Sequence, residues 1–187
     1  MIHFSPNIIG PLFFLSEVCF GCIKKSGSNT NSADAGSFKI IWLAVLSGMA
    51  LAVVANLTVP GARSATLVDL NLVGFLVFAS GVLLRWYSIF YLGRFFTVDI
   101  AIAADHQVID SGPYRYIRHP SYAGVLLAFL GLGICFGNVL SLLVIMVATT
   151  WVFIYRIKIE EAALIGALGE RYVRYAARTK RLIPCVY

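Results

Sequence analysis

The chain has 187 residues, of which 59% are hydrophobic and only 13% are charged, and its mean hydropathy is +0.84. A soluble domain carries about 25% charged and about 45–50% apolar residues, so this composition indicates a single-domain integral membrane protein. The net charge of +6 does not indicate nucleic-acid binding, because the basic residues flank apolar segments, as membrane-proximal charges do. The pair Cys19 and Cys22 has no second CxxC and no nearby histidine, so we predict no metal site.

Five segments are apolar enough to form membrane-spanning helices, each of which needs about 20 residues. In chain order they are residues 8–23, 38–59, 70–92, 121–136 and 139–155. The first has its positive charges after the apolar run, so we interpret it as a retained helix and not as a signal peptide. Only Gly137 and Asn138 separate the last two, which predicts a helical hairpin. We predict an all-α integral membrane protein with about five transmembrane helices.

The distribution of basic residues predicts how these helices are oriented. Lys24, Lys25 and Lys39 lie in the first connection, and a basic tail follows the last span. With five spans, these groups and the arginines after the third span all fall on one side of the membrane. The positive-inside rule then places the N-terminus outside and the C-terminus in the cytoplasm.

The connection between the third and fourth spans, residues 93–120, is too long for a simple connector. Residues 98–102 alternate weakly between apolar and polar, which predicts a short hairpin or an extended strand. Long loops with their own order usually serve function.

The densest group of polar and aromatic side chains is the segment 112–124, GPYRYIRHPSYAG, which opens the fourth span. Pro120 suits the first turn of a helix, and the unpaired N–H groups there would favour an anionic group beside Arg118 and His119. The alternative is a basic and aromatic belt at the lipid headgroups. That alternative accounts well for the tyrosines and for Arg115, but less well for Arg118, His119 and Pro120 as a unit.

A second polar group follows the last span, where Arg156, Lys158, Glu160 and Glu161 occur. An ordinary surface ion pair between Arg156 and Glu160, four residues apart on a helix, is one interpretation. Adjacent acids at a membrane boundary are costly unless they are paired or solvated, which favours function. Because the ends of a helical hairpin are neighbours, we expect this group to meet Arg118 and His119. Arg85, in the third span, either extends toward the headgroups or faces the same site.

These residues resemble the signature of the isoprenylcysteine carboxyl methyltransferase and phospholipid methyltransferase superfamily. The resemblance rests on segment 112–124 and on the tail, with LGERY at 168–172 and TKRLIP at 179–184. The segment 92–98, LGRFFTV, also matches many bacterial members, which implies a bacterial plasma membrane. The resemblance covers residues 84–187, which would form the methyltransferase core, whereas residues 1–83 would be a scaffold of N-terminal transmembrane helices.

The resemblance implies a methyl donor, S-adenosylmethionine, in a pocket without a Rossmann fold that faces the cytoplasm. It implies that Arg118 and Arg156 are the catalytic residues beside the acceptor. The residues that it places around the cofactor are Tyr114, His119, Pro120, Tyr122, Glu160 and Glu161.

Several functions stay open at this point. The acceptor most in keeping with the resemblance is the carboxylate of an isoprenylcysteine or a related lipid-like molecule that enters from the bilayer. A phospholipid amine would require deprotonation, for which His119 is an available base. Membrane sterol reductases, which use NADPH, share a similar Arg-His-Pro segment. A scaffold or transporter subunit without catalysis is the remaining alternative.

Overall fold

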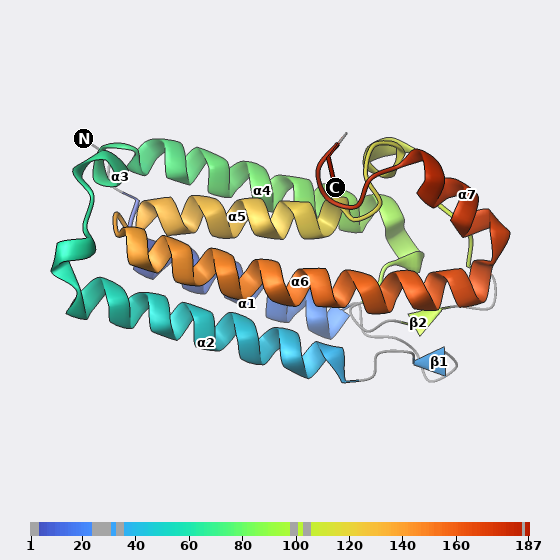
Figure 1. Cartoon of the computed structure of the whole chain (residues 1–187), viewed down its shortest axis with the longest axis horizontal. Helices are drawn as coiled ribbons and strands as arrows, with labels where there is room; N and C mark the ends of the chain where they lie inside the picture. The colour runs from blue at the N-terminus through green and yellow to red at the C-terminus, as the bar shows by residue number, and fades with distance from the viewer. Residues whose placement is uncertain (1–3, 24–30, 33–35, 98–100, 103–105, 185) are drawn as a thin grey trace.

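The computed structural model describes residues 4–23, 31–32, 36–97, 101–102, 106–184 and 186–187. Five long helices lie side by side (Figure 1): α1 (Pro6–Ile23), α2 (Ser37–Thr58), α4 (Asn71–Leu92), α5 (Pro120–Cys135) and α6 (Val139–Leu168). Two shorter helices are α3 (Ala65–Asp69) and α7 (Glu170–Arg178), and 3-10 turns occur at Pro60–Ala62, Gly93–Phe95 and Gly112–Arg115. The two strands described, β1 (Asn31–Ser32) and β2 (Ala101–Ile102), have two residues each.

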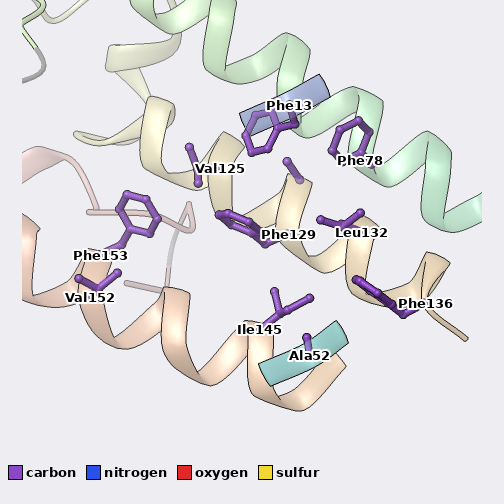
Figure 2. Close-up of a cluster of buried hydrophobic side chains, with 11 residues drawn as sticks. Phe13, Ala52, Phe78, Val125, Phe129, Leu132, Phe136, Ile145, Val152 and Phe153 are labelled. Carbon is purple, nitrogen blue, oxygen red and sulfur yellow. The ribbon is translucent and has the colours of Figure 1, made fainter. Parts of the chain in front are cut away.

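Helix α5 lies at the centre of the bundle, where it packs on α4 and α6, with α2 beyond α6 and α1 behind (Figure 1). The approach of α4 to α5 depends on glycine, because a Cβ at Gly131 would lie 2.2 Å from the backbone nitrogen of Phe78. Figure 2 shows Phe129 and Leu132 of α5 between Phe13 of α1 and Ile145 of α6. This arrangement buries one apolar core through the length of the bundle.

The outer surface of the bundle is apolar, as a bilayer requires. Three helices are long and apolar enough to cross a membrane by length and composition: 39–58, 71–95 and 139–168. Two shorter apolar helices, Pro6–Phe20 and Pro120–Cys135, accompany them. Leucines such as Leu43 and Leu57 are largely exposed, which is favourable only where hydrocarbon surrounds them. The chain is thus an integral, multi-pass membrane protein with a helical fold.

The predicted hairpin of the last two spans is confirmed, and its turn has a clear cause. Gly137 has a φ of 65°, and the Asn138 side chain accepts a hydrogen bond from the Ser141 amide at 3.0 Å, which caps α6. Helix α6 runs to Leu168, well beyond the predicted end at residue 155. The hydropathy pattern ends at the membrane boundary, whereas the helix continues because its polar extension packs in the site described below.

The connection 93–120 contains the extended segment expected from the sequence. Its strand β2 pairs with β1 of the first connection in antiparallel register, with Asn31 opposite Ile102, so the fold is helical with one small sheet. Part of this prediction, at 98–100, lies outside the described residues, as do Lys24 and Lys25 and the side chain of Cys22. The boundary proposed between residues 83 and 84 falls within α4.

Candidate active site

The polar segments converge at the end of the bundle away from the α5–α6 turn, where α7 lies across the extension of α6 (Figure 1). There they line a cavity that we call the polar cavity. Six of the eight site residues expected from the sequence line it: Tyr114, Arg118, His119, Tyr122, Arg156 and Glu160. Of the other two, Pro120 is the buried first residue of α5, and Glu161 lies behind Arg118 and His119. The expected meeting of the two polar groups is confirmed.

Glu161 binds three basic side chains at once. Its Oε1 accepts a hydrogen bond from Arg118 Nε at 2.7 Å and lies 3.4 Å from His119 Nε2. Its Oε2 accepts from Arg181 Nε at 2.9 Å, and this bond raises the pKa of Arg181. Because both oxygens are engaged, Glu161 joins α5, α6 and the C-terminal tail.

Arg118 is held on its other side by the backbone of α7. Its Nη1 donates to the carbonyl of Ala176 at 2.8 Å and also to the carbonyl of Thr179. Arg118 reaches these carbonyls because the chain after α7 runs beside it: the amides of Arg118 and His119 donate to the carbonyls of Lys180 and Arg181. The tail therefore lies against the segment that leads into α5, with one parallel bridge between Ile117 and Lys180.

This packing contradicts the anion site that the sequence suggested at the start of α5. The amides of Arg118 and His119 are used by the tail, and those of Tyr122 and Ala123 donate to the carbonyl of His119. These four donors are therefore already bonded within the protein and are not available to an anion. Sequence reasoning missed this because the tail, some 60 residues downstream, carries no sign that its carbonyls return here.

Glu160 faces the polar cavity with Tyr122 and His119. The Tyr122 hydroxyl donates to Glu160 Oε2 at 2.7 Å, and the His119 and Tyr122 rings stack with centroids 5.5 Å apart. Arg156 is only 2% exposed and donates to the hydroxyl of Ser37 in α2, so the interpretation of Arg156 as part of a surface ion pair is wrong.

Three buried tyrosines complete the site: Tyr114, Tyr172 and Tyr175. The Tyr175 hydroxyl donates to the carbonyl of Tyr114 at 2.7 Å, and the Tyr114 hydroxyl donates to the carbonyl of Ser88 at 3.2 Å. Burial raises the pKa of each phenol above the ordinary value, so all three stay protonated. The Tyr172 hydroxyl has no hydrogen-bond partner among the described residues, although it lines the cavity.

The headgroup-belt interpretation therefore fails for the tyrosines that matter most here. Tyr114 and Tyr122 point into the protein and line the polar cavity. Tyr116, between them in sequence, is 65% exposed, which fits an interfacial position.

Glu17 of α1 is a site residue that the sequence reasoning missed. Arg85 forms a two-pronged ion pair with the Glu17 carboxylate, and its Nη1 donates to Ser121 Oγ at 2.9 Å. This resolves the two interpretations of Arg85 in favour of the inward one. The available signal was an acidic residue in an otherwise apolar span, which is costly in hydrocarbon unless it is paired.

Two further cavities extend from this site into the bundle. An inner cavity is lined by Arg85, Glu17, Tyr122 and Arg156, of which the last two also line the polar cavity. Beyond it lies a larger apolar cavity of about 330 Å³ between α1, α2 and α5. It shares Phe13 and Glu17, among others, with the inner cavity. Through these shared lining residues, the three cavities adjoin one another from the polar end of the bundle to its apolar interior.

Comparison with known proteins agrees with this arrangement. The chain is 35% identical over 108 residues to protein-S-isoprenylcysteine O-methyltransferase B of Arabidopsis thaliana, a match that covers 57% of this chain and 55% of that protein. It is 35% identical over 82 residues to protein-S-isoprenylcysteine O-methyltransferase of Schizosaccharomyces pombe, a match that covers 44% of this chain and 35% of that protein. The chain therefore spans about half the length of these curated relatives, or less.

A solved structure of the eukaryotic intramembrane Ras methyltransferase ICMT has a similar fold, with a TM-score of 0.63 and 27% identity. The similarity covers 78% of this chain and 52% of that one. Residues 72–166, which are 95 of the 187 and extend from α4 through the acidic pair of α6, match the model of one family. This chain belongs to the isoprenylcysteine carboxyl methyltransferase (ICMT) family.

Proposed function

We propose that this chain is a membrane-embedded methyltransferase that uses S-adenosylmethionine and methylates the carboxylate of an isoprenylcysteine or a related lipid-like acceptor. The observation that carries the proposal is that the polar cavity, which holds the family residues, and the apolar cavity both adjoin the inner cavity. An acceptor with a charged head and a hydrocarbon chain needs both environments at once. The names of the relatives, which act on S-isoprenylcysteine, support the same acceptor class.

The residues of the polar cavity fit S-adenosylmethionine. The Tyr122 ring suits a sulfonium cation, and the Glu160 carboxylate, with a side chain 29% exposed, suits hydroxyl or ammonium groups. The buried Tyr172 hydroxyl, which lacks a partner among the described residues, is an available donor. When bound, this cofactor would supply an electrophilic methyl group. Tyr114 and His119 would shape the same pocket, whereas Pro120 and Glu161 would act by positioning the residues that touch it.

For the acceptor carboxylate we assign the binding role to Arg156. Its side chain lines both the polar and the inner cavity, so it lies where the head of an acceptor would meet the cofactor. Arg118 is held by Glu161 and by two backbone carbonyls, so its role would be to fix α7 and the tail. A guanidinium can hold a carboxylate by two hydrogen bonds, and catalysis would then come from positioning and exclusion of water.

The two methyl acceptors differ in how the rate depends on pH. A carboxylate is ionised at neutral pH and needs no general base, so the rate should be flat from near-neutral pH upward. A phospholipid amine must lose a proton, with His119 as the base that the cavity offers. A rate that rises with an amine-like pKa would therefore assign the chain to amine methylation.

We also propose that all five long helices cross the membrane, with the N-terminus outside and the active site facing the cytoplasm, where the cofactor is made. Helix α5, with 16 residues, is shorter than a typical span, but it lies at the centre of the bundle, shielded from lipid. A cysteine placed at exposed Arg171 should react with an impermeant thiol reagent only after cells are permeabilised. Labelling of intact cells would reverse the orientation. The bacterial plasma membrane stays a prediction.

The decisive experiment titrates the purified protein with S-adenosylmethionine and, separately, with NADPH by calorimetry. We expect binding of the first, weakened in His119→Ala and Glu160→Gln and unchanged in Lys158→Ala, an exposed position on the same helix. Transfer of a labelled methyl group to an N-acetyl S-prenylcysteine should follow the same pattern. Binding of NADPH alone would move the chain to reductase chemistry, and no binding of either would favour the scaffold alternative.

A further inference from the structure

The apolar cavity extends along α1 and α2 beside α5, from the active-site end of the bundle toward the α5–α6 turn. At the site end it is bounded by Glu17 and Trp42, and at the far end by Pro6, Val53 and Phe136. Pro6 and Phe136 are buried, so packed side chains form the part of the far end that lies on the axis of the cavity, beside the exposed Asn7. Among its described lining residues, Asn7 and Glu17, at opposite ends, have strongly polar side chains.

The neighbouring inner cavity indicates which kind of molecule fits this apolar cavity. Its site end meets the inner cavity, which Arg156 also lines. A molecule whose carboxylate binds Arg156 would place its chain past the Glu17–Arg85 ion pair and along α1. Phe14 and Leu46 line the cavity and are 37% and 48% exposed, so the cavity also opens sideways toward the bilayer, where such a chain would come from.

The length of the cavity follows from the two helices that enclose it. Its lining residues on α1 run from residue 6 to 17, and those on α2 run from 42 to 53. Each span is eleven residues, or about 16 Å of helix at 1.5 Å per residue. An extended hydrocarbon chain advances roughly 1.25 Å per carbon for bonds of about 1.5 Å, so about thirteen carbons fit.

The volume of the apolar cavity gives the same number of carbons by a separate estimate. A dry cavity of about 150 Å³ in a protein interior holds one benzene, or six carbons. At the same density, about 330 Å³ would hold roughly thirteen carbons.

We propose that this cavity measures the hydrocarbon chain of the acceptor, with a limit of roughly thirteen main-chain carbons set by Phe136, Pro6 and Val53. The proposal rests on the function proposed above, because it concerns the acceptor of that same site. Phe136 is then a residue that determines specificity through chain length, at the end of α5 opposite the chemistry.

The test is a series of N-acetyl S-(n-alkyl)cysteines with six to eighteen carbons, presented at equal mole fraction in lipid nanodiscs. Each carbon up to the limit fills about 25 Å³ of cavity, which is worth roughly threefold in kcat/KM. We expect kcat/KM to rise to twelve to fourteen carbons and to gain nothing at sixteen and eighteen.

Three variants locate the limit. Met49 lies seven residues from Trp42 along the lining of α2, so Met49→Trp should move the break to roughly eight carbons, at about 10 Å from the site end. Phe136→Leu should move it to longer chains. Leu57→Trp, at a 75% exposed position of α2 outside the cavity lining, should leave it at thirteen.

The chain-length proposal would be overturned if kcat/KM rose steadily to eighteen carbons, or if its maximum stayed at the same chain length in both Met49→Trp and Phe136→Leu. Either result would leave the proposed methyltransferase activity unaffected. Absence of methyl transfer to every member of the series would instead overturn the proposed function. An ordinary lipid chain as the occupant would show as unchanged acceptor preference in Met49→Trp, with altered lipid retained through purification.

Discussion

Replacing Glu161 with alanine removes the carboxylate that joins α5 and α6 to the C-terminal tail. The Arg118 and Glu161 side chains are each 9% exposed, and loss of one partner of such a buried pair costs about 3–5 kcal/mol because the other charge stays buried. Arg181 is 36% exposed, so its pair adds at most about 1 kcal/mol. Arg118 keeps its hydrogen bonds to the carbonyls of Ala176 and Thr179 in the variant. We therefore expect the loss of stability to lie at the lower end of this range, about 3 kcal/mol.

The assay is limited trypsin digestion of the protein in nanodiscs, followed at the tail. The carbonyls of Lys180 and Arg181 are hydrogen-bonded to the start of α5, so cleavage there requires the tail to open. When opening is fast relative to cleavage, the rate follows the open population, and about 3 kcal/mol corresponds to roughly a hundredfold faster cleavage. Glu170→Ala, at an exposed acid on α7, is the matched control. An unchanged cleavage rate in Glu161→Ala would refute the reasoning that this carboxylate holds the tail.

Three further predictions concern the packing and ionisation of the bundle. Glu17→Ala should destabilise the protein by about 3 kcal/mol or more, because it leaves the Arg85 charge buried without its partner. The double variant Glu17→Ala/Arg85→Met should recover part of that loss in thermal unfolding. If the two substitutions instead lower the stability additively, the two side chains are not coupled. Gly131→Leu should prevent assembly of α4 against α5, since even a Cβ at this position would lie 2.2 Å from the α4 backbone. A Gly131→Leu protein that elutes as a monodisperse peak on gel filtration would contradict this expectation. The control Gly166→Ala, whose added Cβ meets nothing within 4 Å, should instead stabilise the protein by about 0.5–1 kcal/mol. The three buried tyrosines have pKa values raised above 10.0 by burial, so their contribution is fully present below pH 10 and is lost as pH rises toward their folded pKa values. The thermal midpoint should therefore decline above about pH 10, less steeply in Tyr175→Phe, and a midpoint independent of pH to about pH 11.5 would contradict the assignment.

The sequence alone was sufficient for the starts of the five long helices and for the meeting of the two polar groups. Runs of apolar residues placed the long helices within a few residues of their observed starts, because a lipid-facing helix must be apolar along its whole length. The turn at Gly137 and Asn138 forced two helices to lie antiparallel, and this geometry brings Arg118 and His119 to Glu161.

Other parts of the site depend on contacts between residues far apart in sequence. Glu17 meets Arg85 across 68 positions, and the tail returns to the start of α5 across about 60. Neither contact has a local pattern, because a single ion pair or a strand-like backbone pairing leaves no period in the sequence. The extension of α6 to Leu168 was missed for a related reason: charged residues end the apolar signal but not the helix.

The sequence by itself determined that this protein lies in a membrane, that it is helical, and which two polar segments meet at one end of the bundle. Those properties follow from composition and from short motifs, which act on their neighbours along the chain. Only the tertiary structure distinguished the two arginines, because Arg118 and Arg156 differ not in residue type but in what surrounds them. It also decided the length of the apolar cavity, since a cavity is the space left between packed helices and belongs to no single segment.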